Sequence, residues 1–208
     1  MDRTEDQIPS VQLDGVTAGY QRGREVVSAL DLRVEGPGVV RLAGRNGAGK
    51  STLLELVSGY LRPWAGRVLV NGAPAADLGV RRTRRVCRTQ VALYPHMTVR
   101  DHLAFGARCC GVEAQDGIRR AERHGLGPWL DHNAGALSTG NARKVWLVMC
   151  TLGRFDVVVL DEPFNGIDAE SIDIVVSELA DWAGHALVLL ISHVPPADVA
   201  ITRTVTLR

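Results

Sequence analysis

Residues 44–52 carry the amino acid types that can surround a phosphate group. They fit the pattern G-x-x-x-x-G-K-[ST], in which glycines let backbone N–H groups approach phosphate oxygens, a lysine adds positive charge and a hydroxyl binds Mg²⁺. The candidate binding residues of this loop are, in order, Gly44, Arg45, Asn46, Gly47, Ala48, Gly49, Lys50, Ser51 and Thr52. The loop therefore predicts a site for the phosphates of a nucleotide and for Mg²⁺.

The flanking residues have the patterns that such a loop requires. Residues 39–43 are strand-like, and residues 53–57 have the apolar spacing of a helix. The motif needs this order of strand, loop and helix. Lys50 and Lys144 are the only lysines in a chain that otherwise uses arginine, and a compact ammonium group can follow a phosphate as it moves. We interpret the loop as functional rather than as a chance glycine-rich turn.

A second group of candidate residues closes the apolar run 157–160, which has the composition of a buried strand. We expect Asp161 to bind Mg²⁺ through its water shell, while Ser51 takes a direct position. We expect Glu162 to orient and deprotonate a water that attacks the γ-phosphate. The alternative interpretation is a solvated pair of acids at the end of a strand.

Strand and helix patterns alternate along the chain. Strand signals occur at residues 11–17, 26–34, 39–43, 67–71 and 86–93. One helical pattern begins at Thr98 and another covers residues 115–124. After Ser138 we expect a helix, a strand at 156–160, a helix at 169–182, a strand at 186–191, and a final short helix and strand. This order predicts an α/β protein with a mixed or parallel sheet core and a small inserted α-helical lobe.

Length and composition indicate one globular domain. A chain of 208 residues can bury roughly 70% of its unfolded surface in its own core. A net charge of +1 argues against a general nucleic-acid binder. No apolar stretch approaches the ~20 residues of a membrane helix, and the polar residues 1–7 lack the apolar core of a signal peptide. We expect a protein that is not exported and that needs another chain to work at a membrane.

A dense basic run precedes the middle of the chain and consists of Arg81, Arg82, Arg84, Arg85 and Arg88. The simpler interpretation is a solvated, charge-patterned face. The alternative is contact with acidic lipid headgroups or with an acidic loop of a partner.

Residues 137–141, Leu-Ser-Thr-Gly-Asn, lie between the phosphate loop and the acidic strand end. In this order, the three segments resemble the ATP-binding cassette (ABC) family of ATPases, and the resemblance runs from about Tyr20 to about His193. It implies one P-loop NTPase domain of the ABC ATPase fold over residues 1–208. Residues 10–80 and 138–208 would form the nucleotide-binding core, and residues 81–137 the helical lobe.

The pentapeptide resembles the signature segment of that family. Ser138 is a good amino-terminal cap, and the free N–H groups and positive dipole end of the helix behind it can hold an anion. In the family this anion is the γ-phosphate bound to the opposite subunit, so the resemblance implies that Ser138, Gly140 and Asn141 contact ATP across a homodimer or a paired cassette. Thr139 and Asn141 depart from the commoner glycine and glutamine. The alternative is an ordinary capped helix.

The resemblance implies roles for four further residues. His193 resembles the switch histidine that contacts the γ-phosphate and the catalytic carboxylate. Asp168 resembles the residue of the family that contacts the other subunit. Tyr20 fits the aromatic that stacks on adenine. Gln90 is the candidate for the glutamine that links Mg²⁺ to the transport partner, although Thr89 lies nearer the family position. The alternatives are a polar strand cap for His193, a helix cap for Asp168, a core tyrosine for Tyr20 and a surface residue for Gln90.

The resemblance implies an ATP-binding and ATP-hydrolysing subunit of an ABC transporter, with ATP and Mg²⁺ as cofactors. A dimer closed on two ATP would drive a separate multi-span membrane permease. We expect export, because the signature variant and the short lobe resemble small bacterial efflux-type cassettes. The expected location is cytoplasmic, peripheral on the inner face of the cell membrane, with no nucleic-acid partner. The main alternative is a soluble ABC ATPase of repair, ribosome function or cofactor assembly, and the third is a small-molecule kinase.

Overall fold

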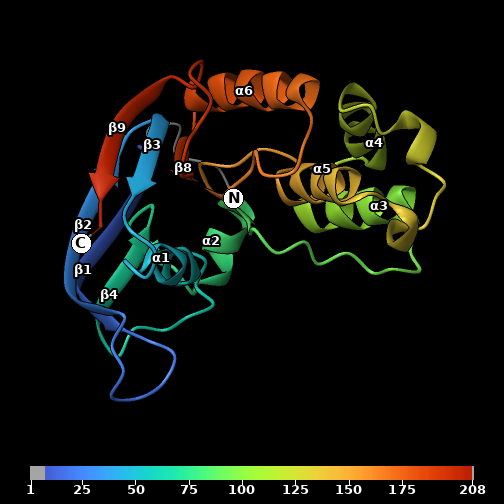
Figure 1. Ribbon diagram of the computed structural model, residues 1–208. Helices are drawn as coiled ribbons and strands as arrows, with labels where there is room; N and C mark the ends of the chain where they lie inside the picture. The colour runs from blue at the N-terminus through green and yellow to red at the C-terminus, as the bar shows by residue number, and fades with distance from the viewer. Residues whose placement is uncertain (1–7, 208) are drawn as a thin grey trace.

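Residues 8–207 are described by a computed structural model, in which nine strands form two sheets (Figure 1). The polar stretch 1–7, on which the expectation of a missing export signal depends, lies outside the described residues. The first sheet is antiparallel, with the strand order β2-β1-β4-β5. Its strands are β1 (Ser10–Ala18), β2 (Val27–Glu35), β4 (Ala65–Val70) and β5 (Ala73–Pro74).

The second sheet is parallel and has the order β6-β7-β8-β3-β9. Its strands are β3 (Gly38–Ala43), β6 (Arg84–Cys87), β7 (Val157–Asp161), β8 (Leu187–Ile191) and β9 (Ile201–Thr206). The central strands β7 and β8 are apolar runs because both faces of the sheet are covered. Helix α1 (Lys50–Val57) and the antiparallel sheet pack on one face, and α5 (Thr139–Cys150) and α6 (Ala169–Ala183) on the other.

Three helices build the lobe that stands beside the sheets in Figure 1. They are α3 (Val99–Cys110), α4 (Ala114–Arg123) and α5, joined by the 3₁₀ turns Gly127–Trp129 and Ala134–Ala136. Thr98 caps α3 in a reciprocal capping box with Asp101, which confirms the predicted start of that helix. Within residues 8–207, no helix combines the length and the apolar character that crossing a membrane requires.

The predicted α/β fold with a parallel sheet is confirmed, but several local predictions are wrong. The strand predicted at 86–93 is β6, which begins at Arg84 and ends at Cys87, because Cys87 is the last residue that pairs with β7. Helix α2 (Leu78–Thr83), capped by Asp77, was not predicted. The helix expected before the last strand is absent from residues 192–200, where Pro195 and Pro196 remove two backbone donors.

The boundaries of the helical lobe also differ from the expected 81–137. Strand β6 follows residue 81 and belongs to the parallel sheet, so the lobe begins later in the chain. Val145 and Val148 of α5 are completely buried in the apolar core of the lobe, so its packing continues past residue 137.

Only part of the basic run forms the solvated face that its composition predicts. The Arg84 side chain is buried, and its guanidinium donates to the carbonyls of Val57 and Ala75, each at 2.7 Å. Burial, with a smaller effect of Arg81 and Arg88, lowers the pKa of Arg84 to about 10. Val57 is the last residue of α1, so this guanidinium satisfies a carbonyl at a helix end that has no intrahelical partner.

The other four arginines of the run range from buried to exposed. Arg85 is buried and donates to the Leu152 carbonyl at 2.8 Å, and Arg88 pairs with the Glu55 carboxylate at 2.7 Å. Of the run, only the first two arginines are exposed. Arg84 and Arg85 are buried and bond to backbone carbonyls. For these two residues, both predictions are therefore wrong: the solvated face, and the contact with lipid or a partner.

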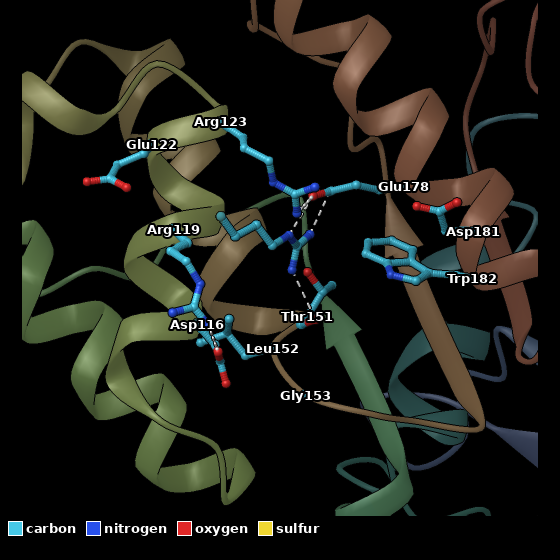
Figure 2. Close-up of a pocket in the computed structure, with 11 residues that line it drawn as sticks. Asp116, Arg119, Glu122, Arg123, Thr151, Leu152, Gly153, Glu178, Asp181 and Trp182 are labelled. Carbon is cyan, nitrogen blue, oxygen red and sulfur yellow. Dashed lines mark hydrogen bonds and ion pairs between the residues drawn. The ribbon is translucent and has the colours of Figure 1, made fainter.

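A buried ion-pair network joins α4 of the lobe to α6 of the core (Figure 2). The guanidinium of Arg120 donates to both carboxylate oxygens of Glu178, at 2.6 and 2.7 Å, and to the Thr151 carbonyl at 3.0 Å. Its guanidinium carbon lies 5.2 Å from the ring centroid of Trp182, and His124 Nε2 lies 3.3 Å from the Glu178 carboxylate. These groups line or adjoin a hollow of about 770 Å³.

The Glu178 carboxyl links the stability of this junction to pH. Burial alone would raise its pKa, but hydrogen bonds from His124 and Arg120 outweigh burial and lower the pKa to about 2. A carboxyl whose pKa falls on folding contributes its full stabilisation only above its unfolded pKa of 4.5. The stabilisation is complete at neutral pH and is lost as the pH falls from 4.5 towards about 2.

We expect Glu178→Gln to lower the free energy of unfolding by about 3–5 kcal/mol at pH 7, because it leaves the Arg120 cation buried without its partner. The variant should also lose less stability than the parent chain between pH 7 and pH 3. The matched control is Asp116→Asn, which breaks the exposed ion pair with Arg119 and should cost less than about 1 kcal/mol. Urea unfolding at both pH values checks this, and equal losses for the two variants would contradict it.

Candidate active site

Four loops meet at the carboxyl edge of the parallel sheet. Because β3, β6, β7 and β8 run in the same direction, the residues that follow them lie along one edge. A hollow of about 390 Å³ opens there. It is lined by Tyr20, Val26, Asn46, Gly47, Gly49, Lys50, Ser51, Thr52, Thr89, Asp161, Glu162, Ile191 and His193. The fold thus brings the predicted phosphate loop, both predicted acids and the predicted histidine into one site.

The phosphate loop ends at the start of α1. Its cap residue, Gly49, has φ 87° and gives no side-chain hydrogen bond, so the first N–H groups of α1 remain available for an anion. A Cβ at Gly49 would lie 2.8 Å from Val27 Cγ1, so a larger residue would also collide with β2. The Lys50 ammonium donates to the carbonyls of Gly44 and Arg45, at 2.7 and 3.0 Å. Gly44, Arg45 and Ala48 lie in the loop but do not line the hollow.

Glu162 is held from both sides at the end of β7. Its N–H donates to the Ile191 carbonyl at 2.8 Å, and its carboxylate accepts the His193 N–H at 3.1 Å. The ring Nε2 of His193 lies 3.8 Å from the same carboxylate oxygen. Glu162 has φ 48°, a backbone conformation that residues other than glycine rarely adopt. A carboxylate and an imidazole are therefore placed side by side, as general-base chemistry would require.

Two residues whose side-chain oxygens suit Mg²⁺ line the hollow. Ser51 and Asp161 both line the hollow beside Lys50. Within residues 8–207, no three side chains of the usual ligand types form a closed metal cluster. This partial set fits an ion that takes its other ligands from phosphates and water, as Mg²⁺ does in nucleotide sites.

Thr89, not Gln90, reaches the hollow. The Thr89 hydroxyl donates to the Asp161 carbonyl at 3.2 Å and the residue lines the hollow, whereas Gln90 does not line it. The structure thus gives no support to a metal role for Gln90. The reason is the early end of β6 at Cys87, which sets Thr89 beside the end of β7. Tyr20 is 61% exposed at the rim, so its interpretation as a core tyrosine is wrong.

The residues of the signature-like segment lie outside the hollow. Ser138 caps α5 and accepts the Asn141 N–H at 3.2 Å, which confirms the predicted cap. Gly140 packs closely on the loop before α6, because a Cβ on it would lie 2.7 Å from the Gly166 carbonyl. Ser138, Gly140, Asn141 and Asp168 do not line the hollow that holds Lys50.

Asp168 caps α6 and also connects it to α5. Its carboxylate accepts the Ser171 N–H at 2.8 Å and pairs with the Lys144 ammonium at 3.1 Å. The backbone N–H of Ser171 contributes most to a lowered pKa of Asp168, and Lys144 adds to it. Asp168 therefore acts as the helix cap that the alternative interpretation predicted.

Two residues at this edge were missed by the motifs. Val26 lines the hollow, and Arg143 is buried beside the loops that carry Thr89 and Glu162. The sequence contains no signal for either, since Val26 reads as strand and Arg143 as one more arginine on a helix.

The comparisons with known proteins agree with this geometry. The family model described as ABC transporter matches residues 27–165. The taurine import ATP-binding protein TauB of Mesorhizobium japonicum is 32% identical over 208 residues, covering 96% of this chain and 80% of that protein. The lipoprotein-releasing system ATP-binding protein LolD 1 of Rhodospirillum rubrum is 30% identical, covering 96% of this chain and 95% of that protein.

Solved structures give the same result. A structure described as the ATP binding subunit of an ABC transporter superposes with a TM-score of 0.84 at 26% identity, covering 95% of this chain and 85% of that one. A bacterial Atm1-family ABC exporter with ATP bound shares the fold, with a TM-score of 0.86 at 23% identity over 97% of this chain and 37% of that one. The chain therefore belongs to the ABC transporter family as an ATP-binding subunit, and it is an ATPase.

Proposed function

We propose that this subunit pairs head to tail with a second copy or a similar cassette around two ATP, and that this dimer drives a separate multi-span membrane permease. One observation carries the proposal. Ser138, Gly140 and Asn141 form the exposed or half-exposed start of α5, yet they do not line the hollow that contains Lys50. A helix start with free N–H groups favours an anion, and the γ-phosphate of a facing cassette fits that description.

In this proposal the residues of one hollow bind the nucleotide and prepare it for hydrolysis. Tyr20 stacks on the adenine, and the amides of the phosphate loop with Lys50 bind the phosphates. Ser51 and Asp161 would hold Mg²⁺, and this ion would neutralise charge on the phosphates. Glu162 orients a water and takes its proton, and His193 holds the Glu162 carboxylate in position.

The permease partner is supported by the names of the relatives. TauB is an ATP-binding protein of taurine import, and LolD 1 belongs to a lipoprotein-releasing system. We propose that this chain docks on the inner face of the cell membrane against such a partner. We propose export as the direction because of the short helical lobe and the variant signature residues Thr139 and Asn141. With a net charge of +1 we expect no nucleic-acid partner.

The partner is tested with a trapped complex. Glu162→Gln, loaded with Mg²⁺ and ATP, is used to recover partners from detergent-solubilised native membranes, and these are identified by mass spectrometry. We expect a multi-span membrane protein in stoichiometric amount that raises the ATPase rate of the parent chain when the two are reconstituted in vesicles. The direction is tested in the same vesicles: export predicts that the substrate moves from the side of the membrane that carries the cassette to the opposite side. Recovery of soluble partners alone would favour the repair, ribosome or assembly class.

We expect Glu162→Gln to retain ATP affinity and to lower turnover by at least ~10²-fold, because it removes the proposed base and keeps the size of the side chain. Calorimetric titration with Mg²⁺-ATP and steady-state phosphate release measure the two quantities. The matched control is Glu170→Gln, an exposed carboxylate in the first turn of α6, which should leave both unchanged. Unchanged turnover in Glu162→Gln would contradict the assignment.

We expect Thr89→Val to lower turnover several-fold and Gln90→Ala to change it by less than about twofold, since only Thr89 reaches the hollow. Valine keeps the shape of threonine and removes the hydroxyl. The same phosphate-release assay, with Mg²⁺ varied at saturating ATP, compares the two variants. The reverse ranking would restore Gln90 as the residue that contacts the metal.

A further inference from the structure

Arg143 makes the densest set of side-chain hydrogen bonds at the carboxyl edge. It lies on the second turn of α5 and is 3% exposed. One guanidinium nitrogen donates to the carbonyls of Arg88 and Thr89, each at 2.7 Å. The other donates to the carbonyls of Asp161 and Glu162, also at 2.7 Å each. One side chain therefore joins the loop after β6 to the loop after β7.

Both loops contribute residues to the hollow. Of these residues, Glu162 depends most on the hydrogen bonds from Arg143. Its positive φ is a conformation that persists only when its surroundings fix it. Its carbonyl is fixed by Arg143 at 2.7 Å and by the Asn165 N–H at 3.2 Å. Because these bonds fix the backbone, they also fix the direction in which the Glu162 carboxylate leaves it, towards the N–H of His193.

We propose that Arg143 is a positioning residue for ATP hydrolysis: by holding the Thr89 and Glu162 carbonyls together, it sets the Glu162 carboxylate in its reactive direction. The proposal rests on the proposed role of Glu162 as base. Arg143 does not line the hollow, so its effect is transmitted through the backbone rather than by contact with ATP. It should therefore influence the hydrolytic step and leave nucleotide affinity nearly unchanged.

The chain contains a matched control for the structural part of this role. Arg85 is also buried, and its guanidinium also donates to several backbone carbonyls, among them those of Leu152 at 2.8 Å and Arg82 at 3.0 Å. It lies outside the hollow. Removing either guanidinium removes several buried hydrogen bonds to backbone carbonyls, so both changes should lower stability. Only the change at Arg143 should alter hydrolysis.

The test compares Arg143→Met with Arg85→Met in the full chain, at a temperature below the melting point of both. We expect similar losses in melting temperature. We expect Arg143→Met to lower kcat at least about tenfold with KM for ATP within about twofold, and Arg85→Met to keep both within about twofold. Arg143→Lys should recover part of kcat, since an ammonium can reach some of the four carbonyls, and it serves as the test variant if Arg143→Met does not fold.

A double-mutant cycle with Glu162→Gln separates this proposal from the role of Glu162 itself. If Arg143 acts through Glu162, Arg143→Met should change the residual turnover of Glu162→Gln by less than about twofold. An equal fold-loss in both backgrounds, an unchanged kcat, or a rise in KM alone would overturn the proposal. If Glu162→Gln by itself leaves turnover unchanged, the proposed base is wrong and the positioning role through it is overturned with it.

Discussion

Buried guanidinium groups that donate to backbone carbonyls hold this fold together at the places where helices and strands end. Carbonyls at such ends have no partner within their own element, and a buried carbonyl without a donor is costly. Arg84 satisfies the end of α1, Arg85 the chain after α5, and Arg143 the ends of β6 and β7. Arginine suits this task because it presents several N–H groups in a rigid plane and stays charged. At these three positions the choice of arginine over lysine thus has a structural reason.

Helix α5 connects the functional parts of the molecule. Its amino-terminal end is capped by Ser138, its second turn carries Arg143, and Lys144 pairs with Asp168 at the start of α6. On its opposite side it contributes apolar residues to the core of the helical lobe. Through Arg143 and Lys144, the first turns of α5 are therefore bonded to Glu162 and to Asp168. The Arg120–Glu178 pair adds a second, purely structural tie between lobe and core.

The sequence predicted those parts of the site in which function requires a fixed local order of residues. The phosphate loop, the strand that ends in Asp161 and the cap at Ser138 are of this kind, and so is the α/β alternation that sets a parallel sheet. Thr89 was harder to predict, because its position depends on where β6 stops pairing with β7. A shift of one residue changes which side chain reaches the hollow.

The remaining errors have physical reasons as well. The basic run looks like a solvated face, since composition cannot show that Arg84 and Arg85 find carbonyls inside the fold. Helix α2 has only six residues, too few for a periodic pattern. The long-range bonds of Arg143 join residues up to 55 positions away in the sequence, and no local spacing encodes them.

We propose that the hollow at the carboxyl edge binds ATP and is completed by the signature-like segment of a second cassette. The most direct measurement is an experimental structure of Glu162→Gln with Mg²⁺ and ATP. We expect a triphosphate along residues 44–52, a metal ion between Ser51 and Asp161, and the Ser138 end of a facing cassette against the γ-phosphate. Nucleotide in the hollow between α4 and α6, or a γ-phosphate enclosed by one chain alone, would contradict it.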